Sequence, residues 1–260
     1  MLERRECRNR MTLSSDRADA RPTGWVYSRP MSNEHRVAGH LGVVADEYDQ
    51  TIRAFIPSYE RMLATVVHWL DGHVPPGGLV VDLGAGTGGL SAAILEGLPT
   101  VRVELVDVDP NMLEVAAERC AHHAGRYELR HGRFEDELTT CHAVVASLAL
   151  HHVATHDEKR ELYSAIFAAL EPGGLVCVAD ALLYGEGPER DRMVEDLFAH
   201  MGRHGISPDE AAAHLAQWAA EDFYVSLPDE LGIIADAGFP RPDCFWREGL
   251  IAVYGGFKDS

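Results

Sequence analysis

The segment Leu79–Ser91, with the sequence LVVDLGAGTGGLS, constrains the fold and function of this chain more than any other part of it. An apolar run ends in the carboxylate of Asp82, and glycines follow at alternate positions, Gly84, Gly86 and Gly88. Glycines have no Cβ atom to hold a ligand away from the backbone. The apolar stretch that follows predicts a helix, whose first N–H groups attract a carboxylate or phosphate. The segment therefore predicts a strand, a ligand-binding turn and a helix.

Two classes of ligand fit this turn. Gly84, Gly86 and Gly89 match the G-x-G-x-x-G pattern of dinucleotide-binding turns, so NAD is one candidate. However, the charge of Asp82 would repel a pyrophosphate and attract an ammonium group. Asp82 and the glycines at 84, 86 and 88 form the pattern D-x-G-x-G-x-G, which resembles the first motif of the class I S-adenosylmethionine (SAM) methyltransferases. SAM carries an ammonium, a sulfonium and no phosphate, so the charge pattern favours SAM as the cofactor.

The next predicted strand ends in a second group of acids. Asp109 lies 21 positions after Gly88, close to the spacing of about 20 for an acid that binds a ribose. A carboxylate has two acceptor oxygens and can bind both ribose hydroxyls. The resemblance implies that Asp109 does so and that Met112 packs on the adenine. The alternative is that Asp107 and Asp109 are solvated acids at a strand end and that Met112 belongs to the core.

The resemblance extends over residues 37–258 and implies further contacts to SAM. Arg133 stands where many relatives carry an acid that binds the adenine amino group, so a backbone contact from Arg133 or Phe134 would replace it. The run AVVASLALHHV at 143–153 resembles the family's fourth strand and the turn after it. There the resemblance implies contacts from the residues that end the strand, Ser147 and Leu148. In the N-terminal element it implies that Tyr48 reaches the methionyl end of SAM.

Strand and helix patterns alternate along the chain, which is typical of an α/β fold with a parallel sheet. The resemblance implies a Rossmann-like, seven-stranded class I methyltransferase sheet whose last two strands form an antiparallel pair. We expect strands near 79–83, 102–107, 127–131, 142–147, 174–180, 243–247 and 250–256. Helices are expected near 59–70, 88–97, 110–123, 157–170 and 228–237.

The domain organisation follows from the segments outside this core. Residues 1–30 are rich in arginine and lack apolar periodicity, which indicates a disordered tail, and Met31 offers a second start. Residues 31–260 are predicted to form one SAM-dependent methyltransferase domain. Within it, residues 35–75 resemble a helical N-terminal lid, and residues 184–226 are predicted to be a helical insertion after strand five that caps the substrate pocket.

The expected reaction is an in-line displacement at the methyl group of SAM, for which alignment of the reactants matters most. His151 is the candidate base, because it follows strand four and titrates near neutral pH. The alternative is that His151 only shapes the pocket. Adjacent histidines in an extended segment point to opposite faces, so His151 and His152 are expected to make poor joint ligands, and no metal is predicted.

The net charge and the hydropathy of the sequence limit which partners the protein is expected to bind. A net charge of −18 argues against nucleic acid as a partner, because such binding rests on Lys and Arg neutralising phosphates. No apolar run is long enough to cross a membrane. Five scattered cysteines without a C-x-x-C motif indicate a reduced, cytoplasmic protein. We therefore expect a small-molecule substrate and no membrane partner; a homodimer stays open.

Four functions are compatible with these sequence features. The leading prediction is SAM-dependent methyl transfer to a small-molecule acceptor, as in specialised metabolism. The N-terminal lid and the closing pattern at 237–258 distantly resemble carboxy-SAM synthase, an enzyme of tRNA modification, but that family's carboxylate-binding arginine has no clear counterpart here. An NAD-binding oxidoreductase is disfavoured by Asp82. A SAM-binding protein without catalytic activity is the last alternative.

Overall fold

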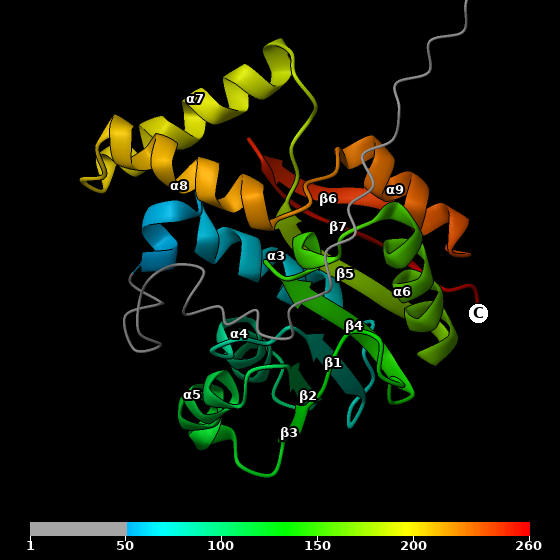
Figure 1. Ribbon diagram of the computed structural model, residues 1–260. Coiled ribbons are helices and arrows are strands. Elements are labelled where there is room, and N and C mark those ends of the chain that lie inside the picture. The colour runs from blue at the N-terminus through cyan, green and yellow to red at the C-terminus, as the bar shows by residue number, and fades with distance from the viewer. Residues whose placement is uncertain (1–50) are drawn as a thin grey trace, which may run out of the picture. The chain divides into compact units, whose positions relative to one another are not determined.

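A seven-stranded mixed sheet forms the centre of the computed structural model, which describes residues 51–260 (Figure 1). Its strand order is β3-β2-β1-β4-β5-β7-β6. The first five strands are parallel, and β7 runs antiparallel to both β5 and β6. The expected sheet and its antiparallel last pair are therefore confirmed. The strands are β1 (Leu79–Leu83), β2 (Arg102–Asp107), β3 (Tyr127–His131), β4 (Cys141–Ser147), β5 (Leu170–Ala181), β6 (Asp243–Glu248) and β7 (Ile251–Phe257).

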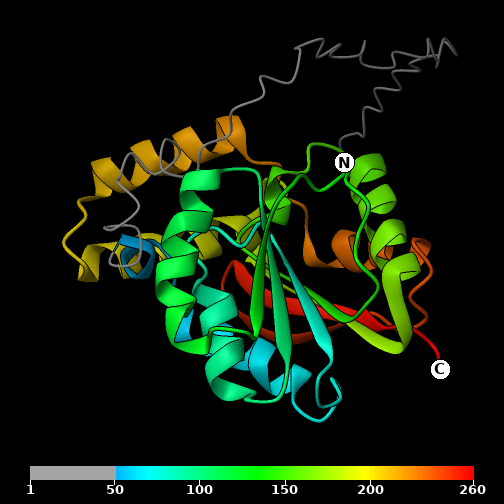
Figure 2. The same ribbon diagram turned by 90° about the horizontal axis from the view of Figure 1, so that it is seen from below.

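Helices cover both faces of the sheet (Figure 2). One face carries α3 (Tyr59–Leu70), α4 (Gly89–Gly97) and α5 (Pro110–Cys120), which is followed by the 3-10 turn η1 (Ala121–His123). The other face carries α6 (His156–Ala169) and α9 (Leu227–Asp236). Each face has its own cluster of buried apolar side chains, so the sheet lies between two hydrophobic cores.

The predicted N-terminal lid is only partly described. Its later part forms α3, where Met62, Val66 and Leu70 are completely buried against the sheet. This part of the expected lid is therefore a layer of the core, because its apolar face repeats at helical spacing and packs inward. Residues 35–50, which include Tyr48, lie outside the described residues, as does the predicted tail at 1–30.

The helical insertion after β5 consists of α7 (Pro188–Arg203) and α8 (Pro208–Glu221), as the sequence predicts. The start of α8 is fixed by a capping box: the Ser207 hydroxyl accepts from the Glu210 N–H, and the Glu210 carboxylate accepts from the Ser207 N–H. The hairpin lies beyond the ends of β4 and β5 (Figure 1). Within residues 51–260, no helix is both long and apolar enough to span a bilayer.

A buried ion pair ties the second helical layer to the sheet. The Lys159 ammonium on α6 donates to both carboxylate oxygens of Glu230 on α9, at 3.2 and 3.0 Å. The hydroxyls of Tyr163 and Tyr254 donate to Oε1 of the same carboxylate at 2.5 and 3.3 Å. All four residues are at most 2% exposed. The carboxylate is thus paired and hydrogen-bonded, as a charge in a core must be.

Candidate functional site

The glycine-rich turn follows β1, whose neighbours β2 and β4 lie on its two sides. In such open sheets, ligands bind at the carboxyl ends of the strands beside this reversal of strand order. Gly84, Gly86 and Gly88 have φ values of +70°, +54° and +76°, which side chains rarely adopt. A Cβ atom at Gly84 would lie 2.6 Å from the Cβ of Ala149. The turn therefore touches the segment that follows β4.

Asp82 lies at the start of this turn and is almost completely buried. The Ser91 hydroxyl donates to its Oδ2 at 2.6 Å, whereas Oδ1 has no hydrogen-bond partner among the described residues. Burial raises the pKa of Asp82 to about 7, although the Ser91 hydrogen bond opposes this shift. A buried carboxylate oxygen without a partner is costly, and a cationic ligand group would supply one.

The two acids after β2 are both buried, so the interpretation of them as solvated strand-end acids is wrong. Asp107 accepts from the Gly86 N–H at 2.7 Å and from the Asp109 N–H at 2.8 Å. Burial raises the pKa of Asp107, while these backbone N–H groups lower it. Asp109 instead caps α5, where its Oδ1 accepts from the backbone and side-chain N–H groups of Asn111. Asp107, and not Asp109, therefore holds the glycine turn.

The residues expected near the adenine lie on both sides of this turn. Met112 is buried on α5. The ring of Phe134 would approach a Cβ on Gly84 to 3.5 Å, which places it beside the turn. The backbone N–H of Arg133 donates to the Asp136 carboxylate at 2.8 Å. This N–H is therefore already bonded within its own loop. Phe134 is thus better placed than Arg133 to contact an adenine.

The chain turns sharply where β4 ends at Ser147. Leu148 has a φ of +53°, an uncommon left-handed conformation for a leucine. The 3-10 turn η2 (Leu150–His152) follows directly. A 3-10 turn rotates successive side chains by about 120°, not by the 180° of a strand. The expectation that His151 and His152 point to opposite faces is therefore wrong: their rings lie 4.3 Å apart.

His151 is held by Asp180, a buried residue near the end of β5. The Asp180 carboxylate accepts from His151 Nδ1 at 2.5 Å and from the His151 backbone N–H at 3.0 Å. Burial lowers the pKa of His151, but the charges of Asp180 and Asp222 outweigh this effect and raise it. Burial conversely raises the pKa of Asp180, but His151, the charge of Lys159 and the Ala181 N–H together outweigh this effect and lower it. An ionised Asp180 fixes the proton on Nδ1, so Nε2 faces away from it.

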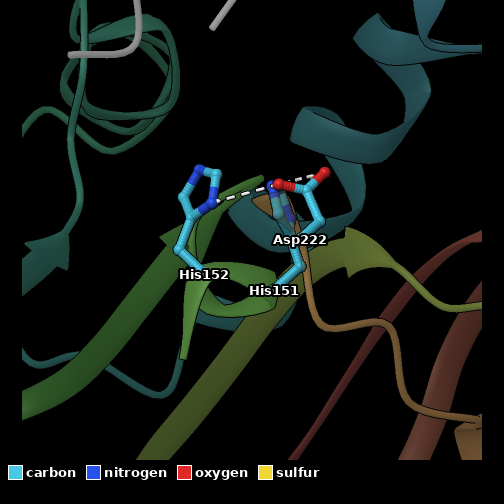
Figure 3. Close-up of side chains that lie close together, drawn as sticks. All are labelled: His151, His152 and Asp222. Atoms are coloured by element: carbon cyan, nitrogen blue, oxygen red, sulfur yellow. Dashed lines mark ion pairs between the residues drawn. The ribbon is translucent and has the colours of Figure 1, made fainter. Parts of the chain in front are cut away.

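Asp222, at the end of α8, completes a group with the two histidines that we call the polar cluster (Figure 3). Its carboxylate lies 3.2 Å from His152 Nδ1 and 3.9 Å from His151 Nε2. The Tyr224 hydroxyl donates to its Oδ2 at 2.6 Å. Burial raises the pKa of Asp222, but His152, His151 and the Tyr224 hydroxyl together outweigh this effect and lower it. Sequence reasoning missed Asp222, because it belongs to no motif and lies 70 positions after His152.

The polar cluster forms part of the wall of a largely apolar cavity. Leu148 lines this cavity beside the cluster, and Ala149, the next residue, touches the glycine turn. Among the described residues, no lysine or arginine contributes to the wall. The remaining lining comes from the segment before α3, from β5 and its end, from α7 and α8, and from the β6–β7 turn: Ile52, Phe55, Ile56, Ala181, Leu183, Val194, Leu197, Leu215, Trp218, Tyr224 and Leu250.

Comparisons with known proteins agree with this geometry. A family described as "Methyltransferase domain" matches residues 81–176, which run from β1 into β5. The carboxy-S-adenosyl-L-methionine synthase of Chromohalobacter salexigens is 25% identical over 254 residues, which cover 94% of this chain and 91% of the relative. This similarity therefore extends over almost the whole length of both proteins.

Solved structures share the fold. An O-methyltransferase family protein from Burkholderia thailandensis superposes with a TM-score of 0.62 at 20% identity, over 83% of this chain and 60% of its own. Human N-acetylserotonin methyltransferase in complex with SAM gives a TM-score of 0.52 at 17% identity, over 88% of this chain and 64% of its own. The chain thus spans less than two thirds of either protein.

Proposed function

Since this chain is a class I SAM-dependent methyltransferase, we propose that its methyl acceptor is a small molecule bound in the apolar cavity. The observation that carries this proposal is the polar cluster in the wall of that cavity. Its His151 is two positions after Ala149, which contacts the glycine turn. Apolar pockets with a few convergent polar groups are typical of small-molecule sites. Human N-acetylserotonin methyltransferase, named for a small acceptor, has the same fold.

The residues around the glycine turn fit SAM. We assign the SAM ammonium group to Asp82, whose buried Oδ1 has no partner among the described residues. The ribose hydroxyls are assigned to Asp107, with Asp109 as the second candidate. Apolar contacts to the cofactor are assigned to Phe134, Met112 and Leu148, and polar contacts to Ser147 and the backbone of Gly84, Gly86 and Gly88. Bound SAM supplies a methyl group that its sulfonium already activates.

His151 is the proposed base for an acceptor whose nucleophilic group carries a proton, as a hydroxyl does. Asp180 holds the proton on Nδ1, so Nε2 carries the free lone pair of a side chain that lines the cavity. Nε2 would take the proton of the acceptor atom when that atom accepts the methyl group, and S-adenosylhomocysteine would be the leaving product. Asp180 then stabilises the imidazolium that results. Apolar side chains of the α7–α8 hairpin and of residues 52–56 line the cavity around this step.

Carboxy-SAM synthesis is a second candidate, because the similarity to such a synthase covers almost the whole chain. The cavity disfavours it: a carboxylate ligand is best held by a lysine or an arginine, and the described lining residues include neither. The net charge of −18 likewise disfavours a tRNA substrate. Mass spectrometry of the SAM-derived product separates the candidates, since methyl transfer yields S-adenosylhomocysteine and the alternative yields SAM with an added carboxylate.

The first experiment is calorimetric titration of the protein with SAM, S-adenosylhomocysteine and NAD, followed by a screen of small acceptors with SAM labelled in its methyl group. We expect binding of the first two ligands, none of NAD, and label in a small product. Label that appears only in RNA would overturn the proposed acceptor class.

Replacing each of the two buried acids, Asp107 and Asp109, by asparagine tests which of them binds the ribose. We expect Asp107→Asn to weaken SAM binding by about 1.5–3 kcal/mol, the usual value of a charge-assisted hydrogen bond. Asp109→Asn is the matched control, because asparagine also caps a helix and keeps an oxygen for Asn111. Calorimetry compares the SAM affinities of the two variants. If Asp109→Asn lost more SAM affinity than Asp107→Asn, the ribose would be assigned to Asp109.

Asp82→Asn tests the ammonium assignment through its pH dependence. The folded protein holds the Asp82 proton more tightly than the unfolded chain, since its pKa rises from 3.8 to about 7. The ligand-free wild type therefore loses stability as the pH rises through this window, whereas the variant does not share this loss. We expect the Tm advantage of Asp82→Asn to grow from pH 5 to pH 8.

SAM binding is expected to respond in the opposite sense. The wild-type affinity rises as the pH passes through about 7, because the ionised carboxylate binds the ammonium. Asp82→Asn lacks this rise and binds SAM about 1.5–3 kcal/mol more weakly at pH 8. Thermal unfolding with and without SAM measures both effects. If wild type and Asp82→Asn bound SAM with equal affinity at pH 8, the assignment of the ammonium group to Asp82 would be wrong.

A further inference from the structure

The polar cluster has the composition and spacing of a transition-metal site. His151 and His152 come from η2, and Asp222 comes from the end of the α7–α8 insertion (Figure 3). One ligand atom of each residue lies within 4.8 Å of the corresponding atoms of the other two. Ligands bound about 2.0–2.2 Å from one zinc ion lie roughly 3.0–3.5 Å apart, so only small side-chain movements are needed.

Neighbouring residues orient these ligands from outside. Asp180 accepts from His151 Nδ1, which leaves Nε2 with a lone pair on the side of Asp222. Tyr224 donates to one oxygen of Asp222, while the other oxygen lies beside His152. Metal-binding histidines usually donate their second ring N–H to a carboxylate in this way, and ligating carboxylates are themselves hydrogen-bonded.

We propose that His151, His152 and Asp222 bind one divalent transition-metal ion such as Zn²⁺. Two imidazole nitrogens and one carboxylate suit zinc, whereas magnesium and calcium prefer oxygen ligands. Three protein ligands leave a coordination position for water, as zinc sites with three ligands do. The expectation of no metal rested on histidines that point apart, and η2 removes that reason.

The effect of the metal on activity rests on the proposed function. Nε2 of His151 has one lone pair, which binds either a proton or a metal ion. A metal-bound cluster therefore lacks the base that methyl transfer needs. Zn²⁺ is expected to inhibit the enzyme reversibly, and EDTA to restore full activity. The site thus couples methyl transfer to the concentration of free zinc.

Zinc titration of the full chain tests the site without SAM or an acceptor. After EDTA treatment and its removal, ZnCl₂ is added in a calorimeter and in thermal unfolding. We expect one ion per chain and a higher Tm. His152→Gln should lower the zinc affinity at least tenfold, and Asp180→Asn by about 10–100-fold, the usual cost of removing a partner that orients a ligand.

The matched control is His204→Gln. His200 and His204 on and after α7 form another close histidine pair, with ring centroids 4.5 Å apart. Zinc held there would be lost in this variant and kept in His152→Gln. We expect the reverse, with the zinc affinity of His204→Gln unchanged.

Three results would overturn the proposal. They are the absence of a zinc-dependent Tm shift, equal zinc affinity in wild type and His152→Gln, and loss of methyl transfer in EDTA with recovery on adding zinc. The last would make the ion an activator in place of an inhibitor. The zinc titration contains no methyl donor, so its failure does not touch the proposed methyl transfer, and absence of methyl transfer does not touch zinc binding.

Discussion

Replacing His151 with glutamine is expected to lower kcat for methyl transfer by about 10²–10⁴-fold, the usual contribution of a positioned base. The glutamine amide can still donate to Asp180 but cannot take a proton from the acceptor. The SAM affinity should stay at the wild-type value, because the ammonium and ribose contacts are assigned to other residues. Single-turnover kinetics in EDTA, with SAM binding measured in parallel, check both parts.

His152→Gln is the matched comparison, because His152 is the neighbouring histidine and its ring faces Asp222 at 3.2 Å. Its loss in kcat should be much smaller than that of His151→Gln. Asp180→Asn should lower kcat as well, since the asparagine no longer fixes the tautomer of His151. If His151→Gln keeps kcat within a few-fold of wild type, His151 shapes the cavity and another group takes the proton.

The fold was predictable because its signals are local. The predicted bounds of β1, β2 and β3 match the structure, since each is a short run between a turn and a helix pattern. The glycine turn was equally readable, because a left-handed φ at alternate positions demands glycine. The helical insertion was also predicted, over residues 184–226, where α7 and α8 lie.

The two acids after β2 show a feature that local sequence signals did not predict. Asp107 and Asp109 lie two positions apart, and the sequence spacing alone favoured Asp109. In the structure Pro110 begins α5, which makes Asp109 the N-cap and commits its Oδ1 to Asn111. Asp107 is thereby left to hold the turn at Gly86. The geometry of a helix start therefore decides which acid holds the glycine turn.

The polar cluster was not predictable, because its parts meet only through the folded insertion. The histidines were expected in an extended segment, and nothing in the sequence signals that Leu148 turns left-handed before them. Asp222 reaches them only because the α7–α8 hairpin returns the chain to the end of β4. Such contacts depend on tertiary packing, which short-range periodicity does not encode.

The largest expected effect on stability lies away from the site, at the buried pair of Lys159 and Glu230. Lys159→Met leaves the Glu230 carboxylate charged in a core where it is 0% exposed. Removing one partner of a buried ion pair typically costs about 3–5 kcal/mol. We expect this loss in the free energy of unfolding at pH 7, measured by urea denaturation. The two tyrosine hydroxyls donate to the carboxylate but cannot neutralise its charge.

The double variant Lys159→Met with Glu230→Gln separates charge from packing. Its glutamine keeps an acceptor oxygen for Tyr163 and Tyr254 and removes the uncompensated charge. Replacing both members of a buried pair by neutral groups is often nearly neutral for stability. We therefore expect the double variant to recover most of the loss of Lys159→Met. A double variant as unstable as the single one would show that the hydrogen bonds of the Lys159 ammonium, and not the uncompensated charge of Glu230, account for the loss.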